Sequence, residues 1–193
     1  MKIAPYVVIK GATVNQPRMR ATTILGLTHK GKAALGGDGQ VSFGDTIMKH
    51  HARKVRKLYN GTILVGCAGA AADALALFDR LEEKLEEFNG DLRRASVELV
   101  KEWRTDRYLR RLEAIMAAVD EKGALILSGE GDLIEPDDGI VAIGSGGPFA
   151  MSAARAYVDS GSKLSVKTIV EKSLKIASSI CVYTNDHITV EEL

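Results

Sequence analysis

Several features are scarce in this 193-residue chain, and each scarcity excludes a class of protein. Only two cysteines are present, Cys67 and Cys181, and each lies inside an apolar run, so no disulfide framework is expected and a reducing compartment fits best. The 26 lysines and arginines nearly cancel the 25 aspartates and glutamates, and a net charge of +1 supplies no general field for binding nucleic acid or an anionic membrane. No apolar run approaches the roughly 18 residues of a membrane-spanning helix, so no transmembrane segment is expected.

Recognisable metal and nucleotide motifs are also missing. No two histidines have the i, i+4 spacing of a helical zinc site, so surface or loop positions are expected for all four, which are His29, His50, His51 and His187. The glycine-rich segment Gly144–Gly147 follows an apolar run, but a dinucleotide fingerprint requires glycine where Phe149 stands, and a nucleophile elbow requires glycine where Ile143 stands. We therefore predict a tight strand-to-helix turn there, and no nucleotide bound by this chain.

The first 21 residues read as a leader that differs from the rest of the chain. Met1–Ala21 has no Asp or Glu and carries several basic residues, as a mitochondrial presequence does, but it is short and poor in serine. Its apolar stretch is broken by Pro5 and is short for a secretory signal. Translation from Met19 is an alternative that leaves only Met19-Arg20-Ala21 to be removed. We predict a single domain at residues 22–193, with residues 1–21 removed or bypassed by the later start.

Hydrophobic periodicity predicts an α+β fold. Apolar residues recur at steps of three and four over about 71–88 and 91–111, which predicts two helices, the second capped by Asp91. Two shorter helices are predicted at Pro148–Val158 and Ser165–Ala177, the latter capped by Ser165. Short apolar runs predict strands at Thr22–Leu27, Ala33–Gly36, Lys54–Tyr59, Thr62–Cys67, Ala114–Val119, Ala124–Leu127, Leu133–Ile134, Ile140–Ile143 and Ile180–Thr184, with Asn60-Gly61 as a two-residue hairpin turn. This order suits two antiparallel sheets packed face to face, with a helical layer on each outside.

One constellation supports nucleophilic chemistry if Thr22 becomes the first residue of the mature chain. A threonine hydroxyl needs a base beside it, and the α-amino group of the same residue, with a pKa near ~7.7–8.0, can act as that base. An ammonium at Lys54 would favour the neutral amine, Asp38 can orient that lysine, and the glycine turn ending at Gly69 offers N–H groups for an oxyanion. Residue types alone favour a plainer interpretation, in which Thr22 starts a strand, Asp38 makes a turn and Lys54 is a solvated charge.

Longer strings of sequence change that balance. Thr22-Thr23-Ile24, Gly37-Asp38-Gly39-Gln40 and Ala52-Arg53-Lys54-Val55-Arg56 are followed in order by Gly66-Cys67-Ala68-Gly69, Glu102-Trp103-Arg104-Thr105-Asp106-Arg107, Ile143-Gly144-Ser145-Gly146-Gly147-Pro148 and Ile180-Cys181-Val182-Tyr183-Thr184-Asn185. Together they resemble HslV (ClpQ), a family of bacterial peptidases related to proteasome β-subunits. The resemblance runs from Thr22 to Leu193 in nearly constant register.

This resemblance implies an N-terminal nucleophile hydrolase fold, a four-layer αββα sandwich. It implies that Thr22 is the nucleophile and, through its amine, the base. Asp38 and Lys54 would be its electrostatic supports, the Gly69 N–H the oxyanion donor, and Ser145 a hydrogen-bonding neighbour. Gly66 and Cys67 would lie near the pocket for the substrate residue that precedes the scissile bond.

The resemblance also implies a monovalent cation, most often sodium, bound by backbone carbonyls. The matching positions are Ser178, Cys181 and Thr184. Many relatives have glycine where Ser178 stands, which a carbonyl ligand tolerates. The 21-residue leader is a second departure, because the family's leader is generally one to a few residues long.

Partners follow from the resemblance in the same way. The expected assembly is two stacked hexameric rings, served by a hexameric AAA+ ATPase, HslU, that threads unfolded protein substrates into the chamber. The expected location is the bacterial cytoplasm, or the mitochondrial matrix if the leader is a presequence. Two alternatives remain, namely a catalytically silent subunit of a proteasome-like ring and an N-terminal nucleophile amidase acting on small molecules.

Overall fold

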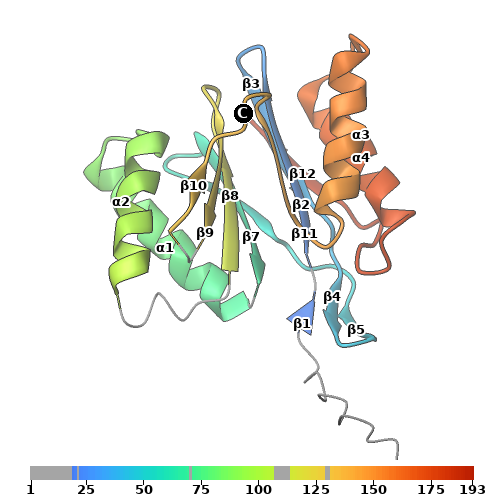
Figure 1. The fold of residues 1–193 in the computed structure, drawn as a ribbon, viewed down its shortest axis with the longest axis horizontal. Helices are drawn as coiled ribbons and strands as arrows, with labels where there is room; N and C mark the ends of the chain where they lie inside the picture. The colour runs from blue at the N-terminus through green and yellow to red at the C-terminus, as the bar shows by residue number, and fades with distance from the viewer. Residues whose placement is uncertain (1–18, 21, 70, 107–113, 129–130) are drawn as a thin grey trace, which may run out of the picture.

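Two antiparallel sheets packed face to face form the centre of the molecule, and a pair of helices covers the outer face of each (Figure 1). The computed structural model describes residues 19–20, 22–69, 71–106, 114–128 and 131–193. The expected α+β class and the four-layer αββα order are both confirmed.

The five-stranded sheet has the order β10–β9–β8–β7–β6 and lies beneath two helices. Its strands are β6 (Val55–Leu58), β7 (Ile63–Gly69), β8 (Ala114–Val119), β9 (Ala124–Ser128) and β10 (Leu133–Ile134), and its helices are α1 (Ala71–Glu87) and α2 (Leu92–Thr105). Asp91 caps α2 as predicted, with its side chain accepting a hydrogen bond from the Arg94 N–H at 3.0 Å.

The four-stranded sheet has the order β11–β2–β3–β12 and carries the other two helices. Its strands are β2 (Thr23–His29), β3 (Lys32–Gly37), β11 (Ile140–Gly144) and β12 (Thr189–Glu192), and its helices are α3 (Gly147–Asp159) and α4 (Val166–Ser178). The predicted Ser165 cap is present, since its hydroxyl accepts from the Thr168 N–H at 3.2 Å.

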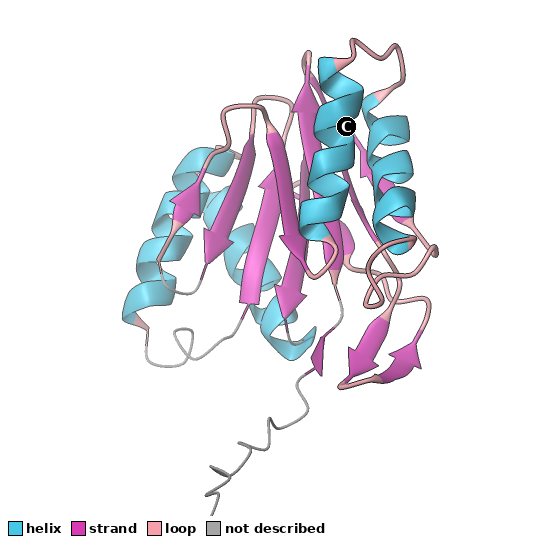
Figure 2. Cartoon of the chain, turned by 45° about the vertical axis from the view of Figure 1, so that its right-hand side comes forward, coloured by secondary structure: helices cyan, strands magenta, loops and turns pink. Residues whose placement is uncertain are grey.

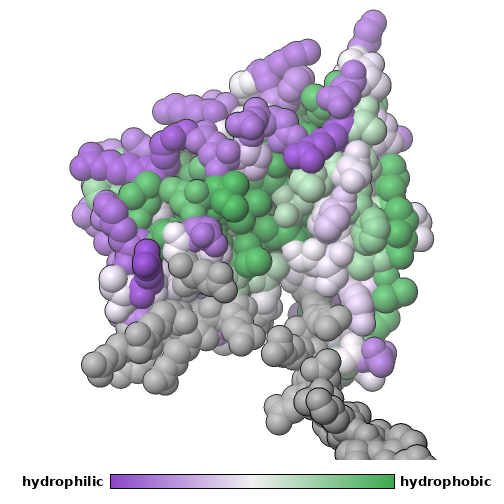
Figure 3. Space-filling view, in the orientation of Figure 1, coloured by the Kyte–Doolittle hydropathy of each residue, from purple (hydrophilic) through white to green (hydrophobic). Residues whose placement is uncertain are grey.

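Three apolar clusters correspond to the three interfaces between the layers. One joins α1 and α2 to the five-stranded sheet around Leu81 and Trp103, and another joins α3 and α4 to the four-stranded sheet around Leu174. The third, which includes Ile24 and Leu64, lies between the two sheets. Because both faces of each sheet are covered, the central strands are apolar runs rather than alternating sequences. Hydrophilic residues gather at the upper end of the molecule, and apolar residues show across its middle (Figure 3).

A small third sheet was not predicted. It consists of β1 (Met19–Arg20), β4 (Val41–Phe43) and β5 (Thr46–Lys49), in the order β1–β4–β5, and its β4–β5 hairpin projects beyond the main sheets (Figure 2). The whole of β5 is exposed, so the burial pattern that marks a strand in the sequence is absent there. The predicted leader falls mostly on residues 1–18 and 21, which lie outside the described residues.

The predicted last strand, Ile180–Thr184, is wrong. After α4 this segment makes consecutive turns, in which the Cys181 N–H donates to the Ala177 carbonyl at 2.8 Å and the Thr184 N–H donates to the Cys181 carbonyl at 3.0 Å. Only the two residues three apart, Cys181 and Thr184, are buried, while Val182 is 79% exposed. That spacing belongs to a turn, and the final strand is β12 instead.

Two boundaries also differ from the sequence prediction. The second helix was expected to reach about Arg111 but ends at Thr105, because Asp106 adopts an extended conformation. The hairpin between β6 and β7 is present, but its tight turn centres on Tyr59 and Asn60, both with positive φ, and closes through the Gly61 N–H and the Leu58 carbonyl at 3.1 Å. In the described residues no helix is both long and apolar enough to cross a membrane.

Candidate active site

Thr22 stands immediately before β2, a central strand of the four-stranded sheet, and is 5% exposed. Its backbone carbonyl accepts a hydrogen bond from the Ser145 N–H at 3.0 Å. Gly144 makes this approach possible: it has φ +84°, and a β-carbon at that position would overlap the Thr22 carbonyl oxygen. The glycine-rich segment predicted as a tight strand-to-helix turn is therefore a turn that holds the backbone of Thr22.

Asp38 directly follows β3, the strand paired with β2. The Asp38 N–H donates to the Thr23 carbonyl at 3.1 Å, and the Thr23 N–H donates to Asp38 Oδ1 at 2.9 Å. The sheet register thus places the carboxylate one residue away from Thr22. This contact joins residues 15 positions apart, and it follows from the hairpin pairing of the two strands.

Lys54 lies just before β6, at the edge of the other sheet, and completes an ion pair across the sandwich. Its Nζ is 2.6 Å from Asp38 Oδ1, and the two side chains are 7% and 0% exposed. Burial lowers the pKa of the Lys54 ammonium, an effect that attraction and hydrogen bonding to Asp38 oppose. The predicted association of Asp38 with Lys54 is present, and the solvated-charge interpretation of Lys54 does not hold.

Asp38 is held by more than its lysine. Besides the Thr23 N–H, its carboxylate accepts from the Gln40 N–H at 3.0 Å and the Asn185 N–H at 3.3 Å, both on Oδ2. Backbone donors on both oxygens fix the orientation of the carboxylate, which in turn fixes the direction of the Lys54 side chain.

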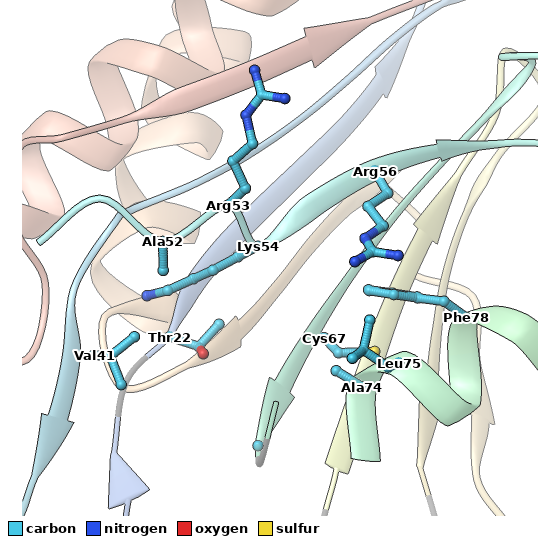
Figure 4. Close-up of a pocket in the computed structure, with 11 residues that line it drawn as sticks. Thr22, Val41, Ala52, Arg53, Lys54, Arg56, Cys67, Ala74, Leu75 and Phe78 are labelled. Atoms are coloured by element: carbon cyan, nitrogen blue, oxygen red, sulfur yellow. The ribbon is translucent and has the colours of Figure 1, made fainter. Parts of the chain in front are cut away.

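A cavity of about 230 Å³ opens beside Thr22 (Figure 4). The lining residues include Thr22, Val41, Arg53, Lys54, Arg56, Cys67, Gly69, Leu75 and Phe78, and the Arg56 guanidinium lies over the Phe78 ring, 5.3 Å from its centre. Figure 4 shows the Lys54 side chain extending toward the part of the cavity where Thr22 and Val41 lie, whereas Cys67, Leu75 and Phe78 gather on the other side of Thr22. The space on that side suits an apolar side chain next to the threonine hydroxyl.

Gly69 ends β7 and lines the same cavity as Thr22. Its φ of +137° lies in a region that L side chains rarely adopt. Helix α1 begins two residues later, so Gly69 lies next to a helix N-terminus, where N–H groups lack intrahelical acceptors. The position agrees with the expected oxyanion donor, and that role remains a prediction.

The two predicted pocket residues differ in location. Cys67 lines the cavity, but Gly66 does not. Successive residues of a strand face opposite sides of the sheet, so Gly66 faces away from the side on which Cys67 lies. A β-carbon on Gly66 would come within 2.8 Å of Ile24 Cδ1, so glycine there lets β7 approach β2. Burial raises the pKa of the Cys67 thiol well above its usual range, which makes that sulfur a poor nucleophile.

The predicted cation ligands lie in and after the last turn of α4. Ser178 is the final helical residue, Cys181 and Thr184 occupy the turns that follow, and this segment approaches the site. Thr184 Oγ1 is 2.7 Å from Thr23 Oγ1, which also accepts from the Gly146 N–H at 2.9 Å. In the described part of the chain, no cluster of three or more His, Cys, Asp or Glu side chains is arranged to hold a metal ion.

Sequence reasoning missed three residues that build this site: Thr23, Gly144 and Asn185. Thr23 was noted only as part of a strand and of a segment that matches the family, and Asn185 only as the end of another such segment. Their roles depend on contacts across more than 120 residues, such as the 2.7 Å contact between Thr23 and Thr184 at a separation of 161 positions. Gly144 could have been found from the sequence, because glycine is the residue that a positive φ and a close backbone approach require.

Comparison with known proteins gives consistent matches along nearly the whole chain. A family model described as "Proteasome subunit" matches residues 19–193. A protein of Chlorobium luteolum named "ATP-dependent protease subunit HslV" is 57% identical over 178 residues, covering 92% of this chain and 97% of its own. One of the same name from Aquifex aeolicus is 58% identical over 175 residues, covering 91% and 99%.

Solved structures agree with these sequence matches. The crystal structure of eukaryotic HslV from Trypanosoma brucei is 44% identical in sequence and has a TM-score of 0.83. The match covers 89% of this chain and 98% of that one. The structure titled "Thiobacillus denitrificans BPH" has a TM-score of 0.66 at 16% identity, over 97% of its chain and 89% of this one, and shows a shared fold alone.

Proposed function

Since this chain belongs to the proteasome subunit family, in its HslV branch, we propose that it is the peptidase subunit of an ATP-dependent protease with Thr22 as its nucleophile. The observation that carries this proposal is the placement of Thr22 in a cavity that it shares with Lys54, the partner of the buried carboxylate of Asp38. Buried, hydrogen-bonded ion pairs beside a hydroxyl in a cleft are typical of active sites. Surface ion pairs, by contrast, contribute little to stability and mark no site.

The reaction begins when the Thr22 hydroxyl oxygen attacks the carbonyl carbon of a peptide bond, while its proton passes to the α-amino group of the same residue. The carbonyl oxygen becomes an oxyanion, which the Gly69 N–H stabilises. Collapse of this intermediate breaks the C–N bond, and the leaving amine takes the proton from the Thr22 ammonium. Water then attacks the resulting ester, which returns the hydroxyl and releases the second product.

Lys54 tunes the base in this scheme. A nearby ammonium disfavours a second positive charge, so it lowers the pKa of the Thr22 amine and keeps the amine able to accept a proton at neutral pH. This function requires that residue 22 be the first residue, because an amide nitrogen in a peptide bond is not a base. Removal of residues 1–21, or of a shorter leader starting at Met19, is therefore part of the proposal.

We further propose a monovalent cation, sodium being the expected one, at the carbonyls of Ser178, Cys181 and Thr184. Support comes from the position of Ser178 at the C-terminal end of α4, where carbonyl groups lack intrahelical donors and carry the negative end of the helix dipole, and from the turns directly after it that hold Cys181 and Thr184. The cation would stabilise the turns that carry Thr184 against Thr23.

The partners proposed are other copies of the chain, in two stacked hexameric rings, and an HslU-type AAA+ ATPase that delivers unfolded proteins. The names of the relatives, which specify an ATP-dependent protease subunit, support an energy-dependent partner. The bacterial cytoplasm is the location that we propose, and the mitochondrial matrix remains the alternative if the leader is a presequence.

Replacing Thr22 with Ala tests the assignment. With the ATPase and ATP present, we expect peptide and unfolded-protein hydrolysis to fall by more than about 10³-fold, as when other nucleophiles are removed. Thr22→Ser should retain measurable turnover, and Thr46→Ala, at an exposed position of β5, should have no effect. Undiminished turnover in Thr22→Ala would overturn the proposal and favour a different nucleophile. If the protein without any substitution assembles correctly but is inactive, the silent scaffold is favoured instead.

A further inference from the structure

The side chain of Asn185 connects two separate segments of the active site. Its Oδ1 accepts a hydrogen bond from the Gly39 N–H at 3.0 Å, and its Nδ2 donates to the His50 carbonyl at 2.9 Å. These partners settle the orientation of the amide, since one offers only a donor and the other only an acceptor. The Asn185 backbone N–H adds the 3.3 Å hydrogen bond to Asp38 Oδ2.

The two segments that the amide joins carry the two members of the ion pair. Gly39 is the residue after Asp38, and His50 begins the stretch that leads into Lys54 four residues later. The Ala52 N–H also donates to the Gly39 carbonyl at 2.9 Å. There is no room for a side chain at Gly39, where a β-carbon would overlap the His50 carbonyl oxygen. The two segments therefore lie in direct backbone contact, and Asn185 spans the junction.

We propose that Asn185 is a positioning residue, which fixes the Asp38–Lys54 pair relative to Thr22 by clamping the segments that deliver each of them. This inference rests on the proposed function. Only an Asn fits both side-chain contacts, because aspartate has no N–H for the His50 carbonyl and alanine reaches neither partner. Small displacements of groups that act through geometry lower kcat strongly, and Asn185 itself is not among the residues that line the cavity.

Steady-state kinetics on the assembled protease with its ATPase test the proposal, using Asn185→Ala and Asn185→Asp. We expect kcat to fall by roughly 10- to 100-fold in Asn185→Ala, with KM changed by less than about twofold. Asn185→Asp, which keeps the acceptor for the Gly39 N–H, should also lose kcat. In both variants the acid limb of the kcat/KM profile should move to higher pH, because a displaced Lys54 lowers the pKa of the Thr22 amine less.

Asp186→Ala is the matched control, since Asp186 is the neighbouring exposed residue, and it should leave kcat and the pH profile unchanged. Native mass spectrometry and thermal melting establish that each variant assembles; if Asn185→Ala does not, Asn185→Asp decides. Unchanged kcat and an unmoved acid limb in the assembled variants would overturn the inference, as would a loss confined to KM. Thr22→Ala in the same assay separates the two proposals. Full turnover in Thr22→Ala would refute the function itself. An inactive Thr22→Ala beside Asn185 variants with unchanged kcat would refute only the positioning role.

Discussion

Substituting Lys54 with Met removes the cation from a buried ion pair while keeping most of the aliphatic stem. The change leaves the Asp38 carboxylate, whose side chain is 0% exposed, without the ammonium that lies 2.6 Å from its Oδ1. Removing one partner of a buried pair destabilises a protein by about 3–5 kcal/mol. The Thr23, Gln40 and Asn185 N–H groups still solvate the carboxylate, so we expect the lower end, about 3 kcal/mol. For a domain of this size, that corresponds to a melting temperature lower by about 6–12 °C.

The same substitution should remove more activity than stability explains. Electrostatic groups that act on the transition state contribute about 2.7–4 kcal/mol, so kcat should fall by about 10²–10³-fold at temperatures where the variant is fully folded. The double variant Asp38→Asn with Lys54→Met should recover part of the melting temperature, because no buried charge is left unpaired, but none of the activity.

Differential scanning fluorimetry and peptide hydrolysis with the ATPase measure the two effects. Lys57→Met is the matched control, because Lys57 lies in β6, the strand that follows Lys54, with a side chain 40% exposed, and it should change stability by no more than about 1 kcal/mol. A melting temperature unchanged in Lys54→Met would refute the account of the ion pair. A double variant less stable than Lys54→Met would refute the argument that an unpaired carboxylate is the source of the loss.

Three further outcomes are expected. Gly144→Ala should abolish most activity, because its methyl group would displace the Thr22 carbonyl. Gly161→Ala is the control: Gly161 has a similar positive φ but nothing within 4 Å, so this variant should show only the backbone strain of about 1–2 kcal/mol. Equal activity losses in the two assembled variants would contradict this expectation. Iodoacetamide at pH 8 should leave the enzyme active, because burial raises the pKa of the Cys67 thiol, and rapid alkylation at that residue with inactivation would show the opposite. The base limb of kcat/KM should have its midpoint below 10.5, because burial lowers the pKa of Lys54 and activity is lost as its proton leaves; a profile flat to pH 10.5 would exclude that role.

The layered fold was predictable because the relevant signals are local. A buried strand such as β7 appears in the sequence as an apolar run. The side chains of Asp91 and Ser165 cap the first turns of their helices, and such residues mark a helix start in the sequence. The order of these elements already predicted two sheets packed face to face between helical layers, and the resemblance to a peptidase family implied the same arrangement. The exposed strand β5 was missed because nothing in its burial distinguishes it from a loop.

The site was predictable in its residue types but not in its connections. Sequence reasoning proposed Asp38 and Lys54 together, and the register of β2 and β3 with the approach of β6 brings them into contact. It misread the segment after α4 as a strand, since an apolar run of five residues does not reveal a turn. Asn185 escaped notice for a related reason: its partners are separated from it by 135 and 146 positions, and no local pattern marks a side chain that bridges distant segments.

The intact mass of the active protein, measured after reaction with a peptide electrophile that modifies nucleophilic hydroxyls, tests the central claim most directly. We expect a chain that begins at Thr22, carrying one adduct on that first residue, with loss of activity in proportion to the modified fraction. A fully active chain that still carries residues before Thr22, or an adduct on any other residue, would contradict it.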